Sequence, residues 1–314
     1  MFDFTGKRYI FFGFSIVLTI IGIIALFING LQYDIKFDGG TIIKIQMADN
    51  NYDDNEVSTA IKDTIGITPI TQKLQTIATG QTDEVFLLQM KFAKKDALTD
   101  PQINQIIEKV KSDFNVKSGD PIIEFETVTP SIGDEYKQKG LLAVVISSIL
   151  IILYVWPRFS VMSGLSAALM AVVALVHDVF IMISVYAIFK IPVNESFIAA
   201  VLTILGYSIN DTIIVYDRIR ENSKLIRKSA TFDLVNRSIS QTLTRSINTI
   251  ATTLIAVVTV YIAASIANIG SLKEFTFPLI IGIVSGCYSS IFVASPLWAM
   301  WKEFKAKKRI RRHA

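Results

Sequence analysis

Residues 197–216 form an apolar run that contains a carboxylate. At about 20 residues this run can cross the hydrocarbon core of a bilayer as one helix, and Asn210 and Asp211 lie within it. An Asp near the centre of a membrane helix costs roughly 2.5–3.5 kcal/mol on insertion scales. A chain keeps such a group where it faces the protein interior, finds a partner or exchanges protons, so Asp211 is a candidate functional residue. A hydrogen bond to a neighbouring helix is the structural alternative.

The composition agrees with a protein of many membrane spans. Hydrophobic residues make up 51% of the 314-residue chain and charged residues 18%, which is too apolar for a soluble domain of this size. The single cysteine, Cys287, excludes an intrachain disulfide. Residues 31–138 hold 18 acidic and 11 basic side chains, whereas the basic excess elsewhere lies beside apolar runs. This distribution bears on membrane topology and predicts no nucleic-acid partner.

Six apolar runs predict six transmembrane helices. The first, residues 9–28, follows Lys7 and Arg8 but is longer than the core of a signal peptide and lacks a small-x-small cleavage site, so it is expected to be retained. The other five are residues 140–156, 161–189, 197–216, 247–267 and 275–301.

Basic residues predict the orientation of these helices. The connection 217–244 carries six Lys or Arg residues, the tail 302–314 carries seven, and Arg158 lies in a short turn. Positive residues remain on the cytoplasmic side, so both termini are predicted to be cytoplasmic and residues 31–138 extracytoplasmic. The tail is expected to attract anionic membrane lipids, with a ribosome or protein partner as the alternative. The expected domains are residues 1–30, 31–138, 139–301 and 302–314.

The polar region between the first two spans alternates strand and helix patterns. A helical pattern covers residues 57–65, and a second helix begins near Asp100, the expected cap, with Pro101 in its first turn. The order βαββαβ predicts a ferredoxin-like α+β domain. The region has no His or Cys, so we expect no catalytic set and no metal or cofactor site, and its role is protein contact or spacing. The strand patterns are at residues 41–47, 68–78, 84–92 and 121–128.

Phe37, Asp38, Gly39 and Gly40 follow the first span. Paired glycines permit backbone conformations that other residues avoid, so Asp38, Gly39 and Gly40 are expected to form a tight junction between membrane and domain. A phosphate loop is disfavoured because the pattern has neither the lysine nor the helix start of a P-loop.

Other spans also carry polar groups. His177 and Asp178 lie in the third span, and Arg245 opens the fifth. Asp211 is expected about 8 Å from the cytoplasmic end of its helix, within reach of a snorkelling Arg245. An arginine that approaches and leaves a buried carboxyl group is what a proton carrier needs. His177 is a candidate proton relay, and a satisfied His–Asp hydrogen bond is the alternative.

Small residues predict close helix packing. Gly282, Gly286 and Ser290 recur every four residues in the sixth span, which is a small-xxx-small face. Gly206 is expected to serve the same purpose in the fourth span.

Taken together, these motifs resemble the SecF family, the smaller half of the SecDF complex of bacterial protein export. The stretch G-Y-S-I-N-D-T with D-R-I-R-E-N is highly specific, whereas F-D-G-G alone is weak. Ser184 departs from the family, which usually has Gly six residues after the H-D pair. The stretches that carry the resemblance are residues 37–40, 174–178, 206–213, 217–222, 270–272, 286–292 and 296–297.

The resemblance implies an α-helical polytopic membrane protein that forms half of an RND-type unit. It implies pairing with a SecD-like subunit, use of the proton gradient and help for unfolded preprotein moving through the SecYEG channel of the bacterial plasma membrane. It implies no enzymatic activity. Asp211 matches the proton-transferring carboxylate and Arg245 the arginine that tunes it. Asn210 lies beside the carboxylate, and His177 with Asp178 matches a further family motif.

Two alternatives remain open at this point. A homo-oligomer of six-span halves could export small hydrophobic molecules. An intramembrane aspartyl protease could use Asp178 and Asp211, but these carboxyl groups would have to share a proton, and no G-x-G-D motif occurs.

Overall fold

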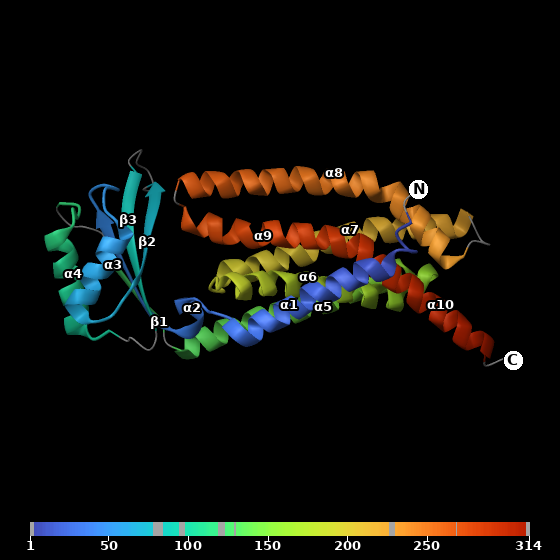
Figure 1. Ribbon diagram of the computed structural model, residues 1–314, viewed down its shortest axis with the longest axis horizontal. Helices are drawn as coiled ribbons and strands as arrows, with labels where there is room; N and C mark the ends of the chain where they lie inside the picture. Colours follow the sequence, from blue (N-terminus) through green and yellow to red (C-terminus); the bar gives the residue numbers. More distant parts are fainter. Residues whose placement is uncertain are drawn as a thin grey trace.

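The computed structural model describes residues 3–77, 84–93, 98–118, 123–128, 130–225, 230–267 and 269–311. It consists of a long helical bundle with a small α/β domain at one end (Figure 1). The start of α1 (Arg8–Asn29) and the whole of α10 (Ser295–Arg311) lie at the opposite end, called here the far end.

The small domain is a four-stranded antiparallel sheet with two helices on one face (Figure 1). Its strand order is β2-β3-β1-β4, so the predicted ferredoxin-like βαββαβ arrangement is confirmed. Alternate residues of β1 point to the helices, and Ile43 and Ile45 are fully buried there against Val57 and Ile106. The elements are β1 (Gly40–Met47), α3 (Asp54–Ile65), β2 (Ile70–Ile77), β3 (Glu84–Ala93), α4 (Asp100–Asp113) and β4 (Ile123–Val128).

The start of α4 differs from the prediction by one residue. The N-cap is Thr99, whose backbone N–H donates to the Gln102 Oε1 atom at 3.0 Å. Asp100 is therefore in the first turn, where its charge suits the helix dipole, and the cap prediction for Asp100 was wrong.

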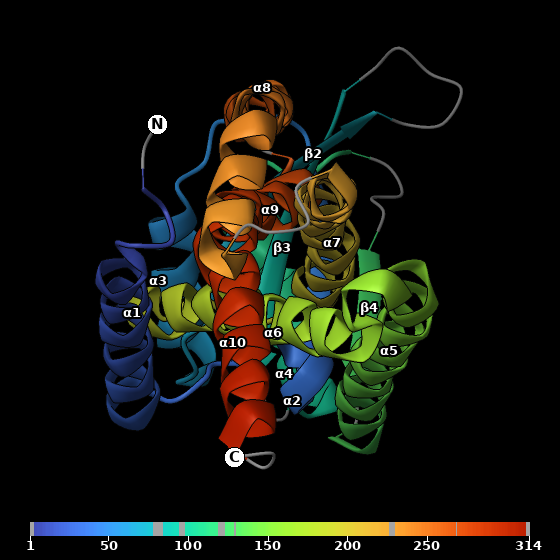
Figure 2. The same cartoon turned by 90° about the vertical axis from the view of Figure 1, so that its right-hand side faces the viewer.

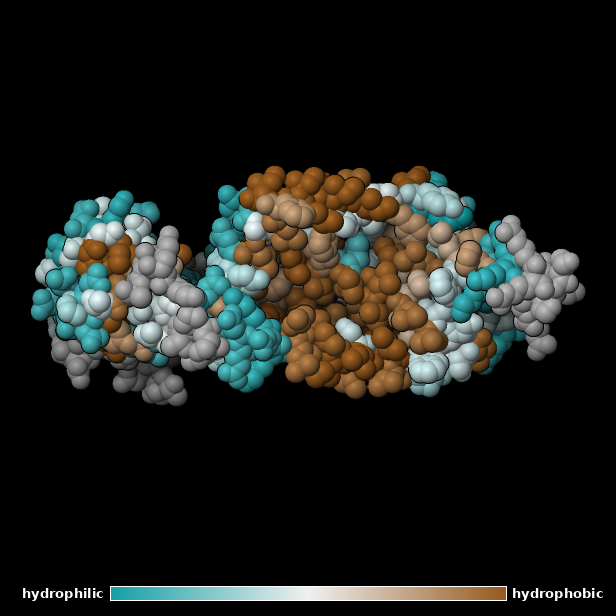
Figure 3. Space-filling model, turned by 90° about the horizontal axis from the view of Figure 1, so that it is seen from below, coloured by the Kyte–Doolittle hydropathy of each residue, from teal (hydrophilic) through white to brown (hydrophobic). Residues whose placement is uncertain are grey.

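Six helical segments are long and apolar enough to cross a membrane by length and composition. A hydrophobic band covers the bundle, and hydrophilic residues lie at both of its ends (Figure 3). The segments are α1, α5 (Pro130–Arg158), α6 (Gly164–Phe189), α7 (Glu195–Leu225), α8 (Thr231–Ile266) and the continuous pair α9 (Gly270–Ser289) and α10, which are joined by a π-helical turn (Ser290–Ala294).

Several helices extend beyond their apolar runs. The connection expected at residues 217–244 is largely helical, because α7 continues to Leu225 and α8 begins at Thr231. Similarly, α5 begins at Pro130, within the range assigned to the domain, and includes Pro157 and Arg158, which were expected to form a turn. Hydropathy marks where a helix crosses the bilayer, whereas polar residues outside the bilayer can continue the same hydrogen-bond ladder.

The helices α6, α7 and α9 occupy the centre of the bundle, with α1, α5 and α8 around them (Figure 2). Two apolar clusters fill the interior. The far-end cluster includes Phe159, Tyr216 and Trp298. The domain-end cluster includes Phe197 and Ile283.

The domain is tied to the bundle through residues that follow α1. The Asp34 N–H donates to the Val193 carbonyl oxygen at 2.9 Å, in the connection between α6 and α7. Lys36 forms an ion pair with Glu195 at 2.5 Å, at the start of α7. Burial alone would lower the pKa of Lys36, but the hydrogen bond and charge of Glu195 raise it above its ordinary value. The contacts link the domain directly to α7.

The junction residues lie next to these contacts. Asp38 ends the short helix α2 (Ile35–Asp38) and pairs with Lys137 of α5 at 2.9 Å. Gly39 and Gly40 have φ angles of 86° and 149°, in the region that favours glycine. A Cβ on Gly40 would lie 2.3 Å from the Phe92 carbonyl oxygen, so only glycine fits where β1 begins.

Candidate functional site

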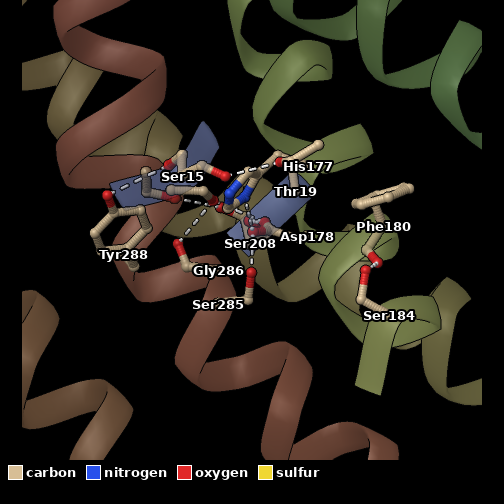
Figure 4. Close-up of polar contacts among 12 residues, drawn as sticks. Ser15, Thr19, His177, Asp178, Phe180, Ser184, Ser208, Ser285, Gly286 and Tyr288 are labelled. Carbon is tan, nitrogen blue, oxygen red and sulfur yellow. Dashed lines mark hydrogen bonds and ion pairs between the residues drawn. The ribbon is translucent and has the colours of Figure 1, made fainter. Parts of the chain in front are cut away.

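Asp178 lies between the two apolar clusters, and its side chain is fully buried. It accepts hydrogen bonds from the hydroxyl groups of Ser208 at 2.8 Å, Ser285 at 2.7 Å and Ser289 at 2.8 Å. Figure 4 shows Ser208 and Ser285 converging on Asp178 from different helices. Because Asp178 is on α6, Ser208 on α7 and the other two serines on α9, one carboxylate joins the three central helices.

His177 lies beside this carboxylate, with its Nδ1 atom 3.4 Å from Asp178 Oδ1. Its Nε2 atom is buried and has no hydrogen-bond partner among the described residues. The ring stacks on Tyr288 at a centroid distance of 6.1 Å, and the Tyr288 hydroxyl donates to the Phe11 carbonyl oxygen at 2.6 Å. The polar network therefore reaches from the central helices to α1.

The π-helical turn lies against this group of polar side chains around Asp178, called here the polar layer. Thr212 Oγ1 and Ser290 Oγ are 2.8 Å apart, and the Ser290 hydroxyl also contacts the Ser208 carbonyl oxygen at 3.2 Å. The hydroxyl group of Ser295 donates to the carbonyl oxygen of Ser290, five residues earlier, at 3.2 Å. Such turns free backbone groups and are frequent at functional sites. The predicted packing residue Ser290 thus takes part in the polar layer.

Asp211 has quite different surroundings. It lies three residues after Ser208 on α7, is 2% exposed, and its Oδ1 atom has no hydrogen-bond partner among the described residues. Unlike Asp178, it is a buried carboxyl group whose oxygen is left unsatisfied.

Arg245 and Asn210 were also predicted at the proton site, but neither pairs with Asp211 among the described residues. Arg245 of α8 is exposed and is close enough for its charge to act on the Asp211 carboxyl group, but no ion pair joins the two in the part of the chain that the structure describes. Asn210 is exposed on another side of α7. The Tyr207 hydroxyl donates to Thr253 Oγ1 at 3.0 Å and so holds α7 against α8 near this site.

Polar residues also occur on the outward sides of these two helices. We call them the polar stripes of α7 and α8. The exposed residues are Thr203, Gly206 and Asn210 of α7, and Arg245, Asn248 and Thr252 of α8.

The glycines predicted to pack closely divide into two groups. A Cβ on Gly282 would lie 2.4 Å from Ile204, and one on Gly286 would lie 3.0 Å from Ser208 Cβ, so α9 approaches α7 closely at both. Gly206 does not pack in this way, because a Cβ there would meet nothing within 4 Å. That prediction was wrong for the contacts within this chain, since Gly206 lies on the outward stripe of α7.

The D-R-I-R-E-N motif has a structural role that sequence reasoning did not identify. Asp217 pairs with Arg158 at 3.3 Å and with Arg220 at 2.8 Å, which holds the end of α5 against α7. Buried Asn222 donates to Ser238 of α8 at 2.8 Å. The serines around Asp178 were also missed, although Ser285 and Ser289 lie at helical spacing inside an apolar run.

The geometry also bears on the chemistry of the two carboxyl groups. Serine hydroxyl groups occupy both oxygens of Asp178, and no hydrogen bond joins it to Asp211 among the described residues. A pair that shares a proton, as in an aspartyl protease, requires such contact. Within the described ranges there is also no group of three His, Cys, Asp or Glu residues placed to hold a metal ion.

Comparison with known proteins agrees with this architecture. The family profile described as "Protein export membrane protein SecD/SecF, C-terminal" matches residues 107–304, more than half of the chain. The protein translocase subunit SecF of Anaerolinea thermophila is 33% identical over 100% of this chain and 98% of its own length. The protein translocase subunit SecDF of Bacillus subtilis is 38% identical over 98% of this chain, which spans 39% of that longer protein.

Solved structures show the same similarity. A crystal structure of SecDF from Thermus thermophilus, described as a translocon-associated membrane protein, matches 96% of this chain and 39% of its own, with a TM-score of 0.76 and 30% identity. SecDF in a super-membrane-facing form matches with a TM-score of 0.70. These relatives support a role in protein translocation. The chain is therefore a multi-pass membrane protein that belongs to the SecF family of protein translocase subunits.

Proposed function

We propose that this protein is a proton-driven auxiliary subunit of bacterial Sec protein export. It acts with a SecD-like subunit in the plasma membrane and assists unfolded preprotein that moves through the SecYEG channel. Both termini are cytoplasmic, and residues 31–138 lie outside. The observation that carries this proposal is the buried, unsatisfied carboxyl group of Asp211 on a membrane helix.

Asp211 suits proton exchange better than Asp178 does. Three hydroxyl donors stabilise the carboxylate of Asp178 in place, and a proton bound there would displace one of them. Asp211 has no such donor among the described residues, and the positive charge of Arg245 attracts its carboxylate form but not its protonated form. Gain or loss of one proton therefore decides whether Asp211 is more stable as a buried neutral acid or as a carboxylate paired with Arg245.

The polar stripes of α7 and α8 support a partner in the membrane. Arg245, Asn248 and Asn210 are exposed in this chain, and exposure of such groups to lipid is unfavourable. A second six-helix half that covers the stripes would shield them and place the proton site between the halves. The SecDF relative, of which this chain spans 39%, supports a SecD-like subunit as that half. Family membership gives no comparable support to the small-molecule exporter.

A change at Asp211 can reach the outer domain through α7. Deprotonation leaves a buried negative charge, and the approach of Arg245 would stabilise it, so α7 and α8 are expected to shift relative to each other. Glu195 at the start of α7, and Val193 in the connection just before it, contact the domain. Movement of α7 would therefore change the position of the domain that meets the preprotein.

The test is the substitution Asp211→Asn in the complex with a SecD-like subunit. We expect the complex to remain folded and proton-gradient-dependent stimulation of preprotein export to be lost, because the amide cannot exchange protons in the same way. The matched control is Asp233→Asn, which makes the same change at an exposed carboxyl group of α8. Normal stimulation by the Asp211 variant would reject the proposal.

A further inference from the structure

A cavity of about 340 Å³ lies between the small domain and the domain end of the bundle. The sheet lies between its own two helices and the bundle, so its open face is turned toward this cavity (Figure 1). Lys91 of β3 is on that open face, because its neighbours Met90 and Phe92 point to the domain helices and are fully buried. Asp34 and Glu274 line the same cavity.

Lys91 and Asp34 form a buried ion pair at this boundary. Lys91 Nζ lies 2.8 Å from Asp34 Oδ2, and the two side chains are only 14% and 8% exposed. The Asp34 backbone is itself bound to the bundle, since its N–H donates to the Val193 carbonyl oxygen. A buried charge is stable only while its partner stays beside it, so this pair holds the sheet against the bundle.

Glu274 of α9 brings a second carboxyl group to the boundary. Its Oε2 atom accepts a hydrogen bond from Asn194 Nδ2 at 2.6 Å, and Asn194 Oδ1 accepts the Phe197 N–H of α7 at 3.0 Å. Glu274 is also close enough to Lys91 and Asp34 for their charges to act on it. The sheet, the junction, α7 and α9 therefore meet at four polar residues, called here the docking cluster: Asp34, Lys91, Asn194 and Glu274.

Other ionisable groups surround Glu274 but leave the balance of the docking cluster unchanged. Two ion pairs among them add no net charge, the tyrosines are neutral near pH 7, and the exposed Lys and Glu side chains are screened by solvent. These groups are the pairs Lys36–Glu195 and Lys44–Glu124, Tyr186 of α6, Tyr261 of α8, Lys273 of α9 and Glu126 of β4.

The charges of the docking cluster depend on one proton. With both carboxyl groups ionised, Asp34 and Glu274 carry two negative charges against the single positive charge of Lys91. Asp34 Oδ1 is buried and has no hydrogen-bond partner among the described residues, so the excess negative charge is poorly stabilised. One proton on Glu274 makes the cluster neutral. Burial and a neighbouring negative charge both favour the protonated form of a carboxyl group.

Protonation is therefore linked to the position of the domain. When the domain separates from the bundle, water enters the boundary and the two carboxyl groups no longer share one buried cation. A proton on Glu274 then stabilises the docked state more than the separated state. Docking is favoured at low pH and weakens as the pH rises.

We propose that the docking cluster is a pH-responsive latch, in which a proton taken up by Glu274 holds the domain on α7 and α9 and its loss releases the domain. The proton comes from the solvent around the domain and returns to it, so the latch needs no transfer across the membrane. The inference goes beyond the proposed function, from which it takes only the extracytoplasmic position of residues 31–138.

The test measures the distance between domain and bundle by pulsed electron spin resonance. Spin labels are attached at Asp63→Cys on α3 and Gln138→Cys on α5, which are both exposed, in a Cys287→Ser background. The full chain is held with its SecD-like subunit in lipid nanodiscs. We expect one distance at pH 5 and a second, longer distance at pH 8, with the ratio of released to docked molecules raised roughly tenfold.

Substitutions within the docking cluster should change this response in opposite directions. Glu274→Gln keeps an acceptor for Asn194 but cannot ionise, so the domain should stay docked at both pH values. Lys91→Met leaves Asp34 without its cation, so the released fraction should rise at both. The matched control Glu108→Gln makes the first change at an exposed carboxyl group of α4 and should respond to pH as the unsubstituted chain does.

The outcomes separate the latch from the membrane carboxyl group. A distance that does not change with pH would overturn the latch, as would a normal pH response in Glu274→Gln or a docked domain at both pH values in Lys91→Met. Asp211→Asn should keep the response, and its loss there would assign the pH dependence to Asp211 and also overturn the latch. None of these results decides the proposed function, because that proposal is tested by export.

Discussion

Asp178 and Asp211 are both buried carboxyl groups near Ser208 of α7. Asp178 accepts a hydrogen bond from Ser208, and Asp211 follows Ser208 by about one turn of the helix. Their other contacts differ. Asp178 receives three hydroxyl donors and connects α6, α7 and α9. Asp211 has an oxygen, Oδ1, with no hydrogen-bond partner in the described part of the chain, and an arginine close enough for its charge to act on it. Hydrogen bonds to a carboxylate are among the stronger ones in proteins, so the contacts of Asp178 stabilise the bundle, whereas Asp211 is the carboxyl group that we propose exchanges protons.

A substitution series at these two residues should separate their roles. Asp178→Ala leaves three serine hydroxyl groups without their acceptor, at about 1–3 kcal/mol for each buried group that stays unpaired. We expect its free energy of unfolding, measured by denaturant titration in detergent, to fall by several times more than that of Asp211→Asn. Asp178→Asn should lie between them, because the amide keeps one acceptor oxygen. Equal stability of Asp178→Ala and Asp211→Asn would contradict the structural role.

At the scale of elements, contact between α7 and α9 organises the centre of the bundle. Glycines at positions 282 and 286 let α9 approach α7, and this approach brings Ser285 and Ser289 within reach of Asp178. The π-helical turn follows directly, where Ser290 meets Thr212. Close packing and the polar layer are thus two consequences of one face of α9.

Alanine substitutions at the glycines test this contact. Gly282→Ala would place a Cβ 2.4 Å from Ile204, a buried and stiff β-branched side chain, so we expect a loss of about 1–3 kcal/mol of stability. Gly206→Ala is the matched control on the facing helix, where a Cβ meets open space and helix propensity favours alanine by roughly 0.5–1 kcal/mol. Thermal unfolding of both variants in the same detergent would measure the difference. A Gly282 variant as stable as the Gly206 variant would disprove the close approach.

At the scale of the whole molecule, two apolar clusters enclose the polar layer in the membrane part, and the domain is bound to one end. The polar stripes of α7 and α8 lie outside these clusters. The contacts of Asp34 with the connection before α7, and of Lys36 with the start of α7, join the domain to the helix that carries Asp211. The site of the charge change and the distant domain are therefore connected through one helix, α7.

The orientation of this body can be measured with single cysteines in a Cys287→Ser background. Asp63 on the domain and Lys305 on α10 are both exposed, so Asp63→Cys and Lys305→Cys report on opposite ends. Because basic residues stay inside, a membrane-impermeant maleimide should label the Asp63 variant in intact cells and the Lys305 variant only after the membrane is opened. The reverse pattern would refute the proposed topology.

The sequence alone was sufficient for the six spans, the βαββαβ order and the choice of Asp211 as the candidate carboxylate. These features are local: hydropathy reports burial in lipid over about 20 residues, and periodicity reports which face of an element is apolar. The resemblance to the SecF family likewise rested on short contiguous motifs, such as residues 206–213.

Tertiary structure alone decided the partners of those residues. It gave Asp178 its three serines and turned Gly206 outward, and among the described residues it left Asp211 Oδ1 without a hydrogen-bond partner and without an ion pair to Arg245. Each outcome depends on the rotation of a helix about its axis and on its register against neighbours. A shift of one residue turns a side chain by about 100°, and only packing of the whole bundle selects among such shifts.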